Sequence, residues 1–348
     1  MSLQNINYSP RFTEYIVASR AFEQKPLVVV DVGARGGFEP HWSLYRDQVR
    51  LLGFEVDVKE CERLNQQVSK SGNRFFPFAL HQDRGKRTFY VTAFPDSSGF
   101  YSPDMQFWQR FPDEVNVVVE KTIQMDTVDF DSFASENDID SVDFIKLDTE
   151  GSELDILKGA IKFIKKSVLG LSIEVEFLQA HKEQPVFSDV DSFLKPLGFR
   201  LYDLTIYRHS RKALPVPTSS PIPGAVERGQ VIWGQALYLR DGVSEIQSSS
   251  SLEDGWDDMK VLKLASIMEL FYLPDCAIEL IQAGQQKGFL QGWDIDGLVD
   301  LLACGVVGGN PFIRHAKHLS IKCLPRPVLL AARNFLLRLK YLIDEIVK

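Results

Sequence analysis

Acidic side chains and Lys146 crowd a strand-to-helix turn in one stretch of this sequence, from Asp143 to Ala160. The stretch starts as a short apolar run that contains Lys146, and it continues into a helical pattern after Asp148, Glu150 and Glu153. Like charges this close together in a strand-to-helix turn are costly unless a cation or a reacting group lies between them. We therefore interpret this turn as the floor of a site that does chemistry.

Asp148 and Glu174 are the candidate general bases, because each ends an apolar run and is expected at the carboxyl end of a strand. Lys146 shares the face of Asp148 by strand alternation, and a buried lysine needs an acidic partner. A structural ion network of these three side chains beneath a pocket is the alternative interpretation. His209, in a long loop, is a second candidate base, although a lone loop histidine is usually just solvated.

A glycine-rich turn follows the β-branched run Leu27–Val32, which is typical of a central parallel strand. Gly33 and Gly37 flank Ala34 and Arg35, and glycines here would let a ligand approach the backbone closely. A helix after the turn would point its amide groups at that ligand. An ordinary tight turn is the alternative interpretation.

Acids near this turn indicate which ligand it would bind. Asp31 lies inside the motif, where it would repel a pyrophosphate but suit the cationic amino-acid end of S-adenosylmethionine. Glu55 ends the next predicted strand, at a spacing that suits an acid on a ribose, or else it is a solvated loop acid. The order G-x-G-x-x-G and a P-loop are both absent, so nicotinamide binding is the weaker alternative.

Strand and helix patterns alternate through residues 27–240, and this predicts an α/β fold with a mostly parallel sheet. Phe199–Ile206 and Val231–Leu239 follow as two strands joined by a long loop, which predicts an antiparallel last strand. Phe75–Leu80 is expected to be one strand, and the segments Gly85–Thr92 and Val115–Met125 are expected to pair. Ser152 and Asp155 are expected to start the helix after Asp148 by a side-chain box.

The sequence divides into four parts. Residues 1–26 are predicted to be a helical extension, residues 27–240 the main domain, residues 241–251 a serine-rich linker, and residues 252–348 a helical domain. Within residues 252–348, acidic residues predominate at the beginning and basic residues at the end, so the two halves of this segment are expected to pack together. The alternative interpretation is that the basic end of this segment forms an amphipathic tail that binds anionic lipid.

Composition restricts the class of protein. A net charge of −8 and a pI near 5.4 argue against a nucleic-acid binder, since no positive field would attract phosphates. The cysteines form no CxxC pair and no metal-ligand spacing, which indicates reduced thiols. No signal pattern or membrane-spanning run occurs, so we expect a cytoplasmic protein.

A family resemblance unites these motifs. The order Asp31-Val32-Gly33-Ala34, the pair Phe54-Glu55 and above all the segment Ile145–Ala160 together resemble the FkbM-type methyltransferases. These are class I S-adenosylmethionine enzymes, many of which methylate hydroxyls of polyketides or of surface-polysaccharide sugars. The resemblance covers roughly residues 25–240 and implies a Rossmann-like class I sheet. Arg35 departs from the glycine that is common in this class, and the helical part after Ser251 has no counterpart in it.

The resemblance also implies roles for single residues. The segment Gly33–Gly37 would wrap the methionine part of S-adenosylmethionine, Glu55 would bind the ribose, and Asp83 or a neighbour would approach the adenine. An ordinary turn at Asp83-Arg84-Gly85 is the alternative there. The implied acceptor is a small molecule or glycan. A binding module without catalysis on the same fold is the alternative function.

Two carboxylates that face an empty position, Asp148 and Glu174, could also hold Mg²⁺. The sequence offers no further fixed ligand, so we expect no metal. The Asn/Asp-Pro-Pro-Tyr sequence of amine methylation is absent after the predicted strand that ends at Asp148. This absence favours oxygen over an exocyclic nitrogen as the acceptor.

Overall fold

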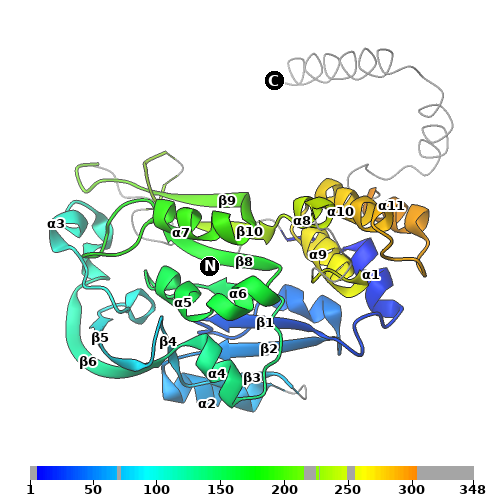
Figure 1. Ribbon diagram of the computed structural model, residues 1–348. Coiled ribbons are helices and arrows are strands. Elements are labelled where there is room, and N and C mark those ends of the chain that lie inside the picture. Colours follow the sequence, from blue (N-terminus) through cyan, green and yellow to red (C-terminus); the bar gives the residue numbers. More distant parts are fainter. Residues whose placement is uncertain (1–5, 69–71, 215–224, 227, 249–254, 304–348) are drawn as a thin grey trace, which may run out of the picture. The chain divides into compact units, whose positions relative to one another are not determined.

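The computed structural model describes residues 6–68, 72–214, 225–226, 228–248 and 255–303 (Figure 1). Several expectations lie outside these residues. They are the proline-rich middle of the loop after Tyr207, the serine-rich end of the predicted linker, Cys304 and Cys323, and the basic tail.

Seven strands form the main sheet in the order β3-β2-β1-β7-β8-β10-β9. The parallel strands are β1 (Leu27–Val32), β2 (Val49–Phe54), β3 (Arg74–Phe76), β7 (Phe144–Leu147) and β8 (Gly170–Glu176). Strand β10 (Gln230–Arg240) runs antiparallel to β8 and to β9 (Phe199–His209). The predicted Rossmann-like, mostly parallel sheet with an antiparallel last strand is confirmed.

A second sheet of three strands has the order β4-β6-β5. It contains β4 (Ala79–Leu80), β5 (Gly85–Thr92) and β6 (Val119–Val128). The predicted pairing of the last two is confirmed, and the structure shows that it is antiparallel. The prediction of one strand over Phe75–Leu80 was wrong, because the segment divides between the two sheets. Pro77 lies at the division, where it has no N–H to donate to a ladder. Three short helices lie between β5 and β6: η2 (Pro95–Ser97), α3 (Met105–Trp108) and η3 (Pro112–Val115).

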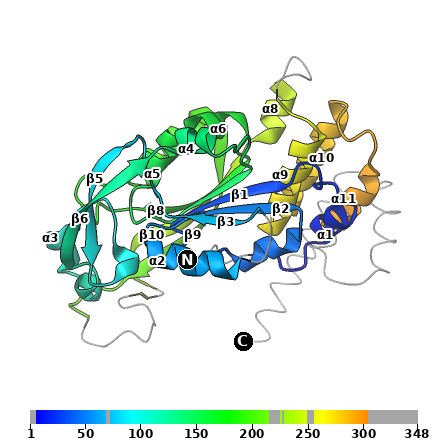
Figure 2. The same cartoon turned by 90° about the horizontal axis from the view of Figure 1, so that it is seen from below.

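Helices cover both faces of the main sheet (Figure 2). One face packs against α4 (Phe130–Glu136), α5 (Glu153–Gly159), α6 (Ile161–Lys166) and α7 (Phe187–Leu194), and η4 (Lys195–Leu197) follows α7. Elements on the opposite side include η1 (Pro40–Tyr45) and α2 (Val58–Gln67). Alternate residues of β1 serve the two cores: Val28 and Val30 face α4–α7, and Leu27 and Val29 face η1.

The helical segment after the sheet belongs to the same compact unit, which extends to Ala303. It comprises α8 (Gly242–Ser248), α9 (Asp258–Leu270), α10 (Pro274–Gln286) and α11 (Ile295–Ala303). Helix α8 occupies most of the predicted linker, residues 241–251. Helix α9 is buried along nearly its whole length and shares a core with η1 and with α1 (Arg11–Ala18). The predicted division into separate domains stays a prediction.

Two buried charged contacts attach α9 to the rest of the unit. The Glu269 carboxylate accepts hydrogen bonds from the backbone N–H groups of Phe12 and Thr13, at 3.0 and 2.8 Å. Helix α1 begins after Pro10, which has no capping side chain, so Glu269 supplies its N-terminal cap from a distant part of the sequence. The second contact joins Lys263 Nζ to Asp143 Oδ2 at 2.7 Å, with both side chains 6% exposed.

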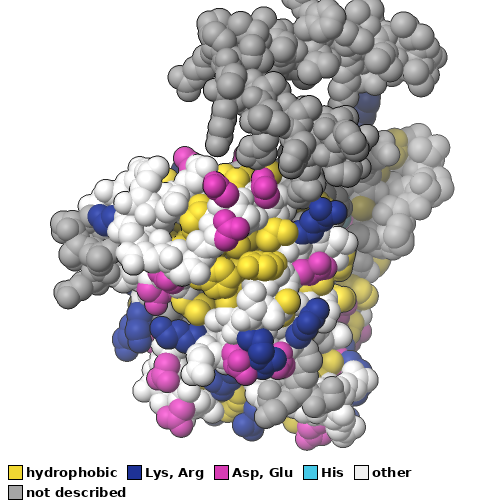
Figure 3. Space-filling view, turned by 90° about the vertical axis from the view of Figure 1, so that its right-hand side faces the viewer, with side chains coloured by type: hydrophobic (Ala, Val, Ile, Leu, Met, Phe, Trp, Pro, Cys, Tyr) yellow, Lys and Arg dark blue, Asp and Glu magenta, His cyan; other side chains and the backbone are white. Residues whose placement is uncertain are grey.

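The surface around α10 and α11 carries a patch of apolar side chains bordered by charged ones (Figure 3). Exposed aromatic side chains also occur on α1 and between α9 and α10, where Tyr15 and Tyr272 are 45% and 55% exposed. Among the described residues, no helix is long and apolar enough to cross a membrane, and Cys61 and Cys276 are free thiols.

We predict that Lys263→Met lowers the free energy of unfolding by about 3–5 kcal/mol, because it leaves the Asp143 carboxylate buried without its cation. Urea unfolding monitored by circular dichroism measures this loss. The double variant Asp143→Asn with Lys263→Met should recover most of it. The exposed pair Lys25–Asp257 is the matched control: Lys25→Met should change stability by less than about 1 kcal/mol. Equal losses at both pairs would contradict the prediction.

Candidate functional site

The candidate site lies at the carboxyl ends of the neighbouring strands β1 and β7. The chain runs outward from β1 through β2 to β3 and then returns to place β7 on the other side of β1, so the strand order reverses here. Crevices for ligands form at such points in open α/β sheets. The two loops touch closely: Asp148 N donates to Val32 O at 3.1 Å, and a Cβ added at Gly33 would lie 1.9 Å from Asp148 O.

One face of the sheet changes from apolar to polar along the strands that border this crevice. On β1, Leu27 and Val29 are followed on the same face by Asp31, and on β7 Phe144 is followed by Lys146. Strand β8 continues the pattern. Its residues on that face are Ser172, which is paired with Lys146, and then Glu174, which is paired with Gln235 of β10. The polar halves of four strands thus form one continuous floor.

Lys146 is held between two carboxylates. Its Nζ lies 3.2 Å from Asp31 Oδ1 and 3.4 Å from Asp148 Oδ2, and it donates to Gly33 O at 3.5 Å. Burial alone would lower the pKa of Lys146, but these carboxylates outweigh burial and raise it. Burial raises the pKa of Asp31. Burial also acts to raise the pKa of Asp148, but the Lys146 ammonium together with hydrogen bonds, one of them to Glu174, outweighs burial and lowers that pKa. Lys146 therefore stays a cation and orients the two carboxylates of the floor. This arrangement corresponds to the alternative interpretation of Lys146 and Asp148 as members of a structural ion network.

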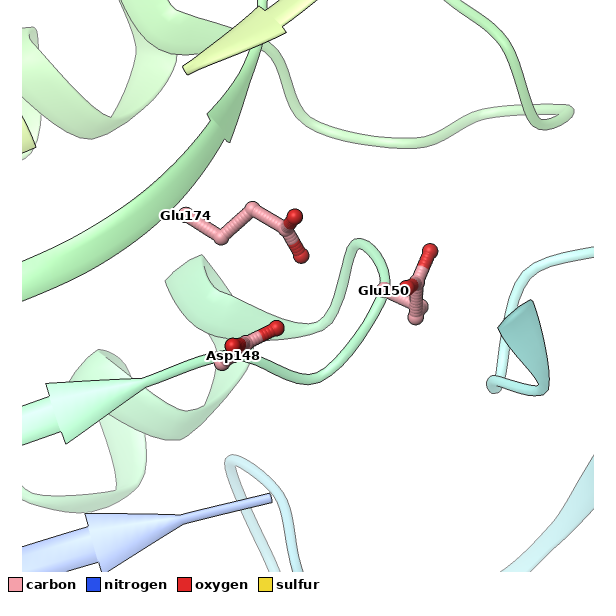
Figure 4. Close-up of side chains that lie close together, drawn as sticks. All are labelled: Asp148, Glu150 and Glu174. Carbon is pink, nitrogen blue, oxygen red and sulfur yellow. The ribbon is translucent and has the colours of Figure 1, made fainter. Parts of the chain in front are cut away.

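Asp148, Glu150 and Glu174 form a carboxylate cluster (Figure 4). One oxygen of each lies within 4.8 Å of the others. Glu174 is 9% exposed, and its Oε2 has no hydrogen-bond partner among the described residues. Burial raises the pKa of Glu174 well above its usual value, and the charges of Asp148 and Glu150 raise it further. Burial and the neighbouring acids Asp148 and Glu176 do the same to the pKa of Glu150.

The loop that carries Glu150 has an uncommon backbone. Glu150 has φ +56° and Gly151 has φ +110°, a left-handed conformation that a non-glycine residue adopts rarely. Glu153 stabilises the loop, since its Oε1 accepts from Thr149 N at 2.7 Å and from Gly151 N at 3.3 Å. The prediction of a helix-start box at Ser152 and Asp155 was wrong: Ser152 makes no side-chain cap, and Asp155 instead accepts from Tyr101 Oη at 2.6 Å.

The residues predicted to bind a cofactor lie around the glycine-rich loop, with one exception. Asp31 and Ala34 are buried, while the Arg35 side chain is exposed and pairs with Asp96 at 2.9 Å. Gly37 has φ +102°, and Glu55 is buried at the end of β2, where its Oε1 accepts from Asp57 N at 2.8 Å. Asp83 is the exception, since it is exposed beside the second sheet and pairs with Arg87. Its predicted adenine contact stays a prediction.

His209 has a structural environment. Its Nδ1 lies 2.8 Å from Asp113 Oδ2, and its Nε2 accepts from Trp233 Nε1 at 3.2 Å. The residue ends β9 and is only 5% exposed in its side chain. Both ring nitrogens are thus occupied, and no described contact joins His209 to the carboxylate cluster, so its role as a second base stays a prediction without geometric support.

Sequence reasoning missed two side chains in the loop after β1. His41 is 4% exposed, and neither ring nitrogen has a hydrogen-bond partner among the described residues. Burial lowers the pKa of His41 to about 4, so the ring is neutral. Glu39 lies near enough to Lys146 and Asp31 to interact with their charges. The sequence could have indicated Glu39 and His41 only through their position directly after the glycine-rich turn. Gln235 was missed too, because only the β8–β10 register places it beside Glu174.

Comparisons with known proteins point to methyl transfer. Residues 31–201 match the family described as methyltransferase FkbM domain. No curated protein matches.

Solved structures with similarity include magnesium protoporphyrin IX methyltransferase from Synechocystis PCC 6803, at 10% identity and a TM-score of 0.30 over 67% of this chain and 80% of that one. Precorrin-6y C5,15-methyltransferase from Geobacter metallireducens has 9% identity and a TM-score of 0.32 over 65% of this chain and 87% of that one. Similarity at this level carries no information about the substrate of this chain.

We predict that Gly33→Ala lowers the free energy of unfolding by at least about 3 kcal/mol, because Ala adds a left-handed backbone cost to a clash with Asp148 O. Gly36→Ala is the matched control. Gly36 also has positive φ, +83°, but a Cβ there would meet nothing within 4 Å, so the loss should stay at about 1–2 kcal/mol. Urea unfolding of both variants tests the difference. Equal losses would show that the close approach of the two loops contributes nothing.

Proposed function

Because residues 31–201 belong to the FkbM methyltransferase family, we propose that this protein transfers a methyl group from S-adenosylmethionine to a hydroxyl of a sugar, a polysaccharide or another polyhydroxylated metabolite. The observation that carries the proposal is the carboxylate cluster at the β1–β7 crevice, where Asp148 lies beside the glycine-rich loop and Glu174 lies close to Asp148. Such a site combines a place for a cationic methyl donor with bases for a hydroxyl.

The residues around the crevice fit S-adenosylmethionine. Gly36 and Gly37 have φ +83° and +102°, and the space where a Cβ of Gly36 would lie is open, so a ligand can approach this backbone. Asp31 and Asp148 supply negative charge at the floor, which suits the sulfonium and ammonium groups. Glu55, buried at the end of β2, would bind the ribose hydroxyls. When bound, the cofactor supplies an electrophilic methyl group.

The chain has two tasks in the transfer. It must hold the acceptor oxygen in line with the methyl group, and such alignment can account for about 7–11 kcal/mol of the barrier. It must also remove the hydroxyl proton as the new O–C bond forms and the C–S bond breaks, with its electron pair left on sulfur. Asp148 and Glu174 are placed to accept that proton, and a positioned base contributes roughly 10²–10⁴-fold. Lys146 orients Asp148 and, as a permanent cation, is no base itself.

Oxygen is the proposed acceptor atom for two reasons. The loop after β7 reads Asp148-Thr149-Glu150-Gly151 and lacks the Asn/Asp-Pro-Pro-Tyr sequence of amine methylation. The cluster also offers several carboxylate oxygens, which accept hydrogen bonds from the hydroxyls of a polyol. The net charge of −8 disfavours a nucleic acid as the acceptor.

Calorimetric titration with S-adenosylhomocysteine tests the cofactor. We expect saturable heat with one site per chain and no heat with NAD. Heat with NAD alone would assign the crevice to a nicotinamide cofactor, and no heat with S-adenosylhomocysteine would refute the proposed function.

We predict that Asp148→Asn and Glu174→Gln each reduce methyl transfer by roughly 10²–10⁴-fold, since each removes a carboxylate from the acceptor side of the crevice. Transfer of labelled methyl from S-adenosylmethionine to glycan extracts measures the rate, and calorimetry should show that Glu174→Gln still binds S-adenosylhomocysteine. Asp126→Asn, at an exposed position of β6, is the control with unchanged rate. Full turnover in both site variants would remove these residues as bases.

A further inference from the structure

We propose that Asp148, Glu150 and Glu174 bind a divalent cation that holds the hydroxyl oxygens of the acceptor. This inference deepens the proposed function and rests on it, and it differs from the expectation from sequence that no metal is bound. Sequence reasoning counted only two facing carboxylates, whereas the left-handed loop brings a third, Glu150, to the same place.

The spacing of the cluster suits an oxygen-binding cation. One oxygen from each carboxylate lies within 4.8 Å of the other two (Figure 4). Opposite ligands of Mg²⁺ at 2.1 Å are about 4.2 Å apart, and those of the larger Ca²⁺ are about 4.6–5.2 Å apart. Three ligands cannot all be opposite one another, and neighbouring ligands are about 3.0 Å apart around Mg²⁺ and about 3.3–3.7 Å apart around Ca²⁺. The carboxylates would therefore close in by about 1–2 Å to coordinate one ion. Three carboxylate ligands in a shell of about six would leave positions for oxygens of a polyol.

Unpaired oxygens beside the cluster are the second observation. Glu174 Oε2 is buried and has no hydrogen-bond partner among the described residues, although its side chain points toward Asp148 and Glu150 (Figure 4). Gln235 is 1% exposed and lies opposite Glu174 in the β8–β10 ladder. Its Nε2 donates to Ser172 Oγ at 2.8 Å, but its Oε1 has no partner in the described part of the chain. Buried acceptors without donors are costly, and a hydrated cation or its bound hydroxyls would satisfy them.

The charge of the floor also favours a bound divalent cation. Lys146 is the nearest cation that the described contacts give, and it already interacts with Asp31 and Asp148. Glu150 and Glu174 have no such partner among the described ion pairs, so the floor contains more negative than positive charge whenever these two carboxyls are ionised. A bound divalent ion would restore the balance. It would also lower the pKa of a hydroxyl that it holds, so that carboxylates, which are weak bases, can remove the proton.

The cofactor itself is the rival occupant, because its ammonium or sulfonium group could face the same carboxylates. The two differ in what binding requires. A cation site binds a metal ion in the absence of cofactor, while a site for the cofactor alone does not. The experiment therefore titrates the full-length protein, freed of metal by a chelator and then dialysed, with Mn²⁺ alone, and follows bound Mn²⁺ by electron paramagnetic resonance.

We expect one Mn²⁺ per chain, and at least a tenfold loss of affinity in both Glu150→Gln and Glu174→Gln. Glu176→Gln is the matched control. Glu176 lies on the same strand and has a buried unpaired oxygen too, but it is outside the cluster, so its affinity should fall less than threefold. The substitution at Glu150 in the loop keeps the test valid if Glu174→Gln fails to fold.

Two outcomes would overturn the proposal. One is no Mn²⁺ binding to the unaltered protein at millimolar concentration, and the other is an equal loss in Glu176→Gln, which would indicate a diffuse acidic field. Calorimetry with S-adenosylhomocysteine on the metal-free protein separates this failure from failure of the proposed function. Binding of S-adenosylhomocysteine without binding of Mn²⁺ would retain the methyltransferase and assign the carboxylates to the cofactor and the acceptor alone.

Discussion

The structure depends on one ion network, the contact of Lys146 with Asp31 and Asp148 across two parallel strands. A buried lysine is tolerated only with carboxylate partners, and each of these carboxylates would be equally costly without the lysine. The network therefore links β1 to β7 at the point where the strand order reverses. It also places the glycine-rich loop against the Asp148 loop, where a side chain at Gly33 would not fit.

The lysine balances only part of the negative charge in the crevice. Glu150 and Glu174 lie close to Asp148, and burial together with mutual repulsion raises the pKa values of both. This arrangement is poor for stability, because it collects like charges in a desolvated place. Such sites persist where ligands or reacting groups relieve the strain, and a sulfonium donor, a divalent ion and a hydroxyl acceptor are all able to do so.

The other half of the same sheet face provides the stability that the crevice lacks. Toward the amino ends of the strands, Leu27, Val29 and Phe144 pack with α9 and η1 in a continuous apolar core. Charged side chains of α9 enter this region only with complete partners, as the Lys263–Asp143 pair shows. Function and stability are thus separated along the strands: one end of each strand is apolar and covered, and the other is polar and faces the crevice.

Local sequence determined the framework of this protein. The run of β-branched residues at Leu27–Val32 and the motif around Asp148 predicted the strands and the loops at their ends, because strand periodicity and turn chemistry act over a few residues. They also predicted the carboxylates at those ends and a methyltransferase-type fold. Pairing between strands that lie far apart in the sequence could not be predicted from such local patterns. Only the β8–β10 register put Gln235 beside Glu174, and only the left-handed backbone at Glu150 brought a third carboxylate to Asp148. Tertiary packing likewise decided that Glu269 caps α1, since the two lie far apart in the sequence and no local signal connects them.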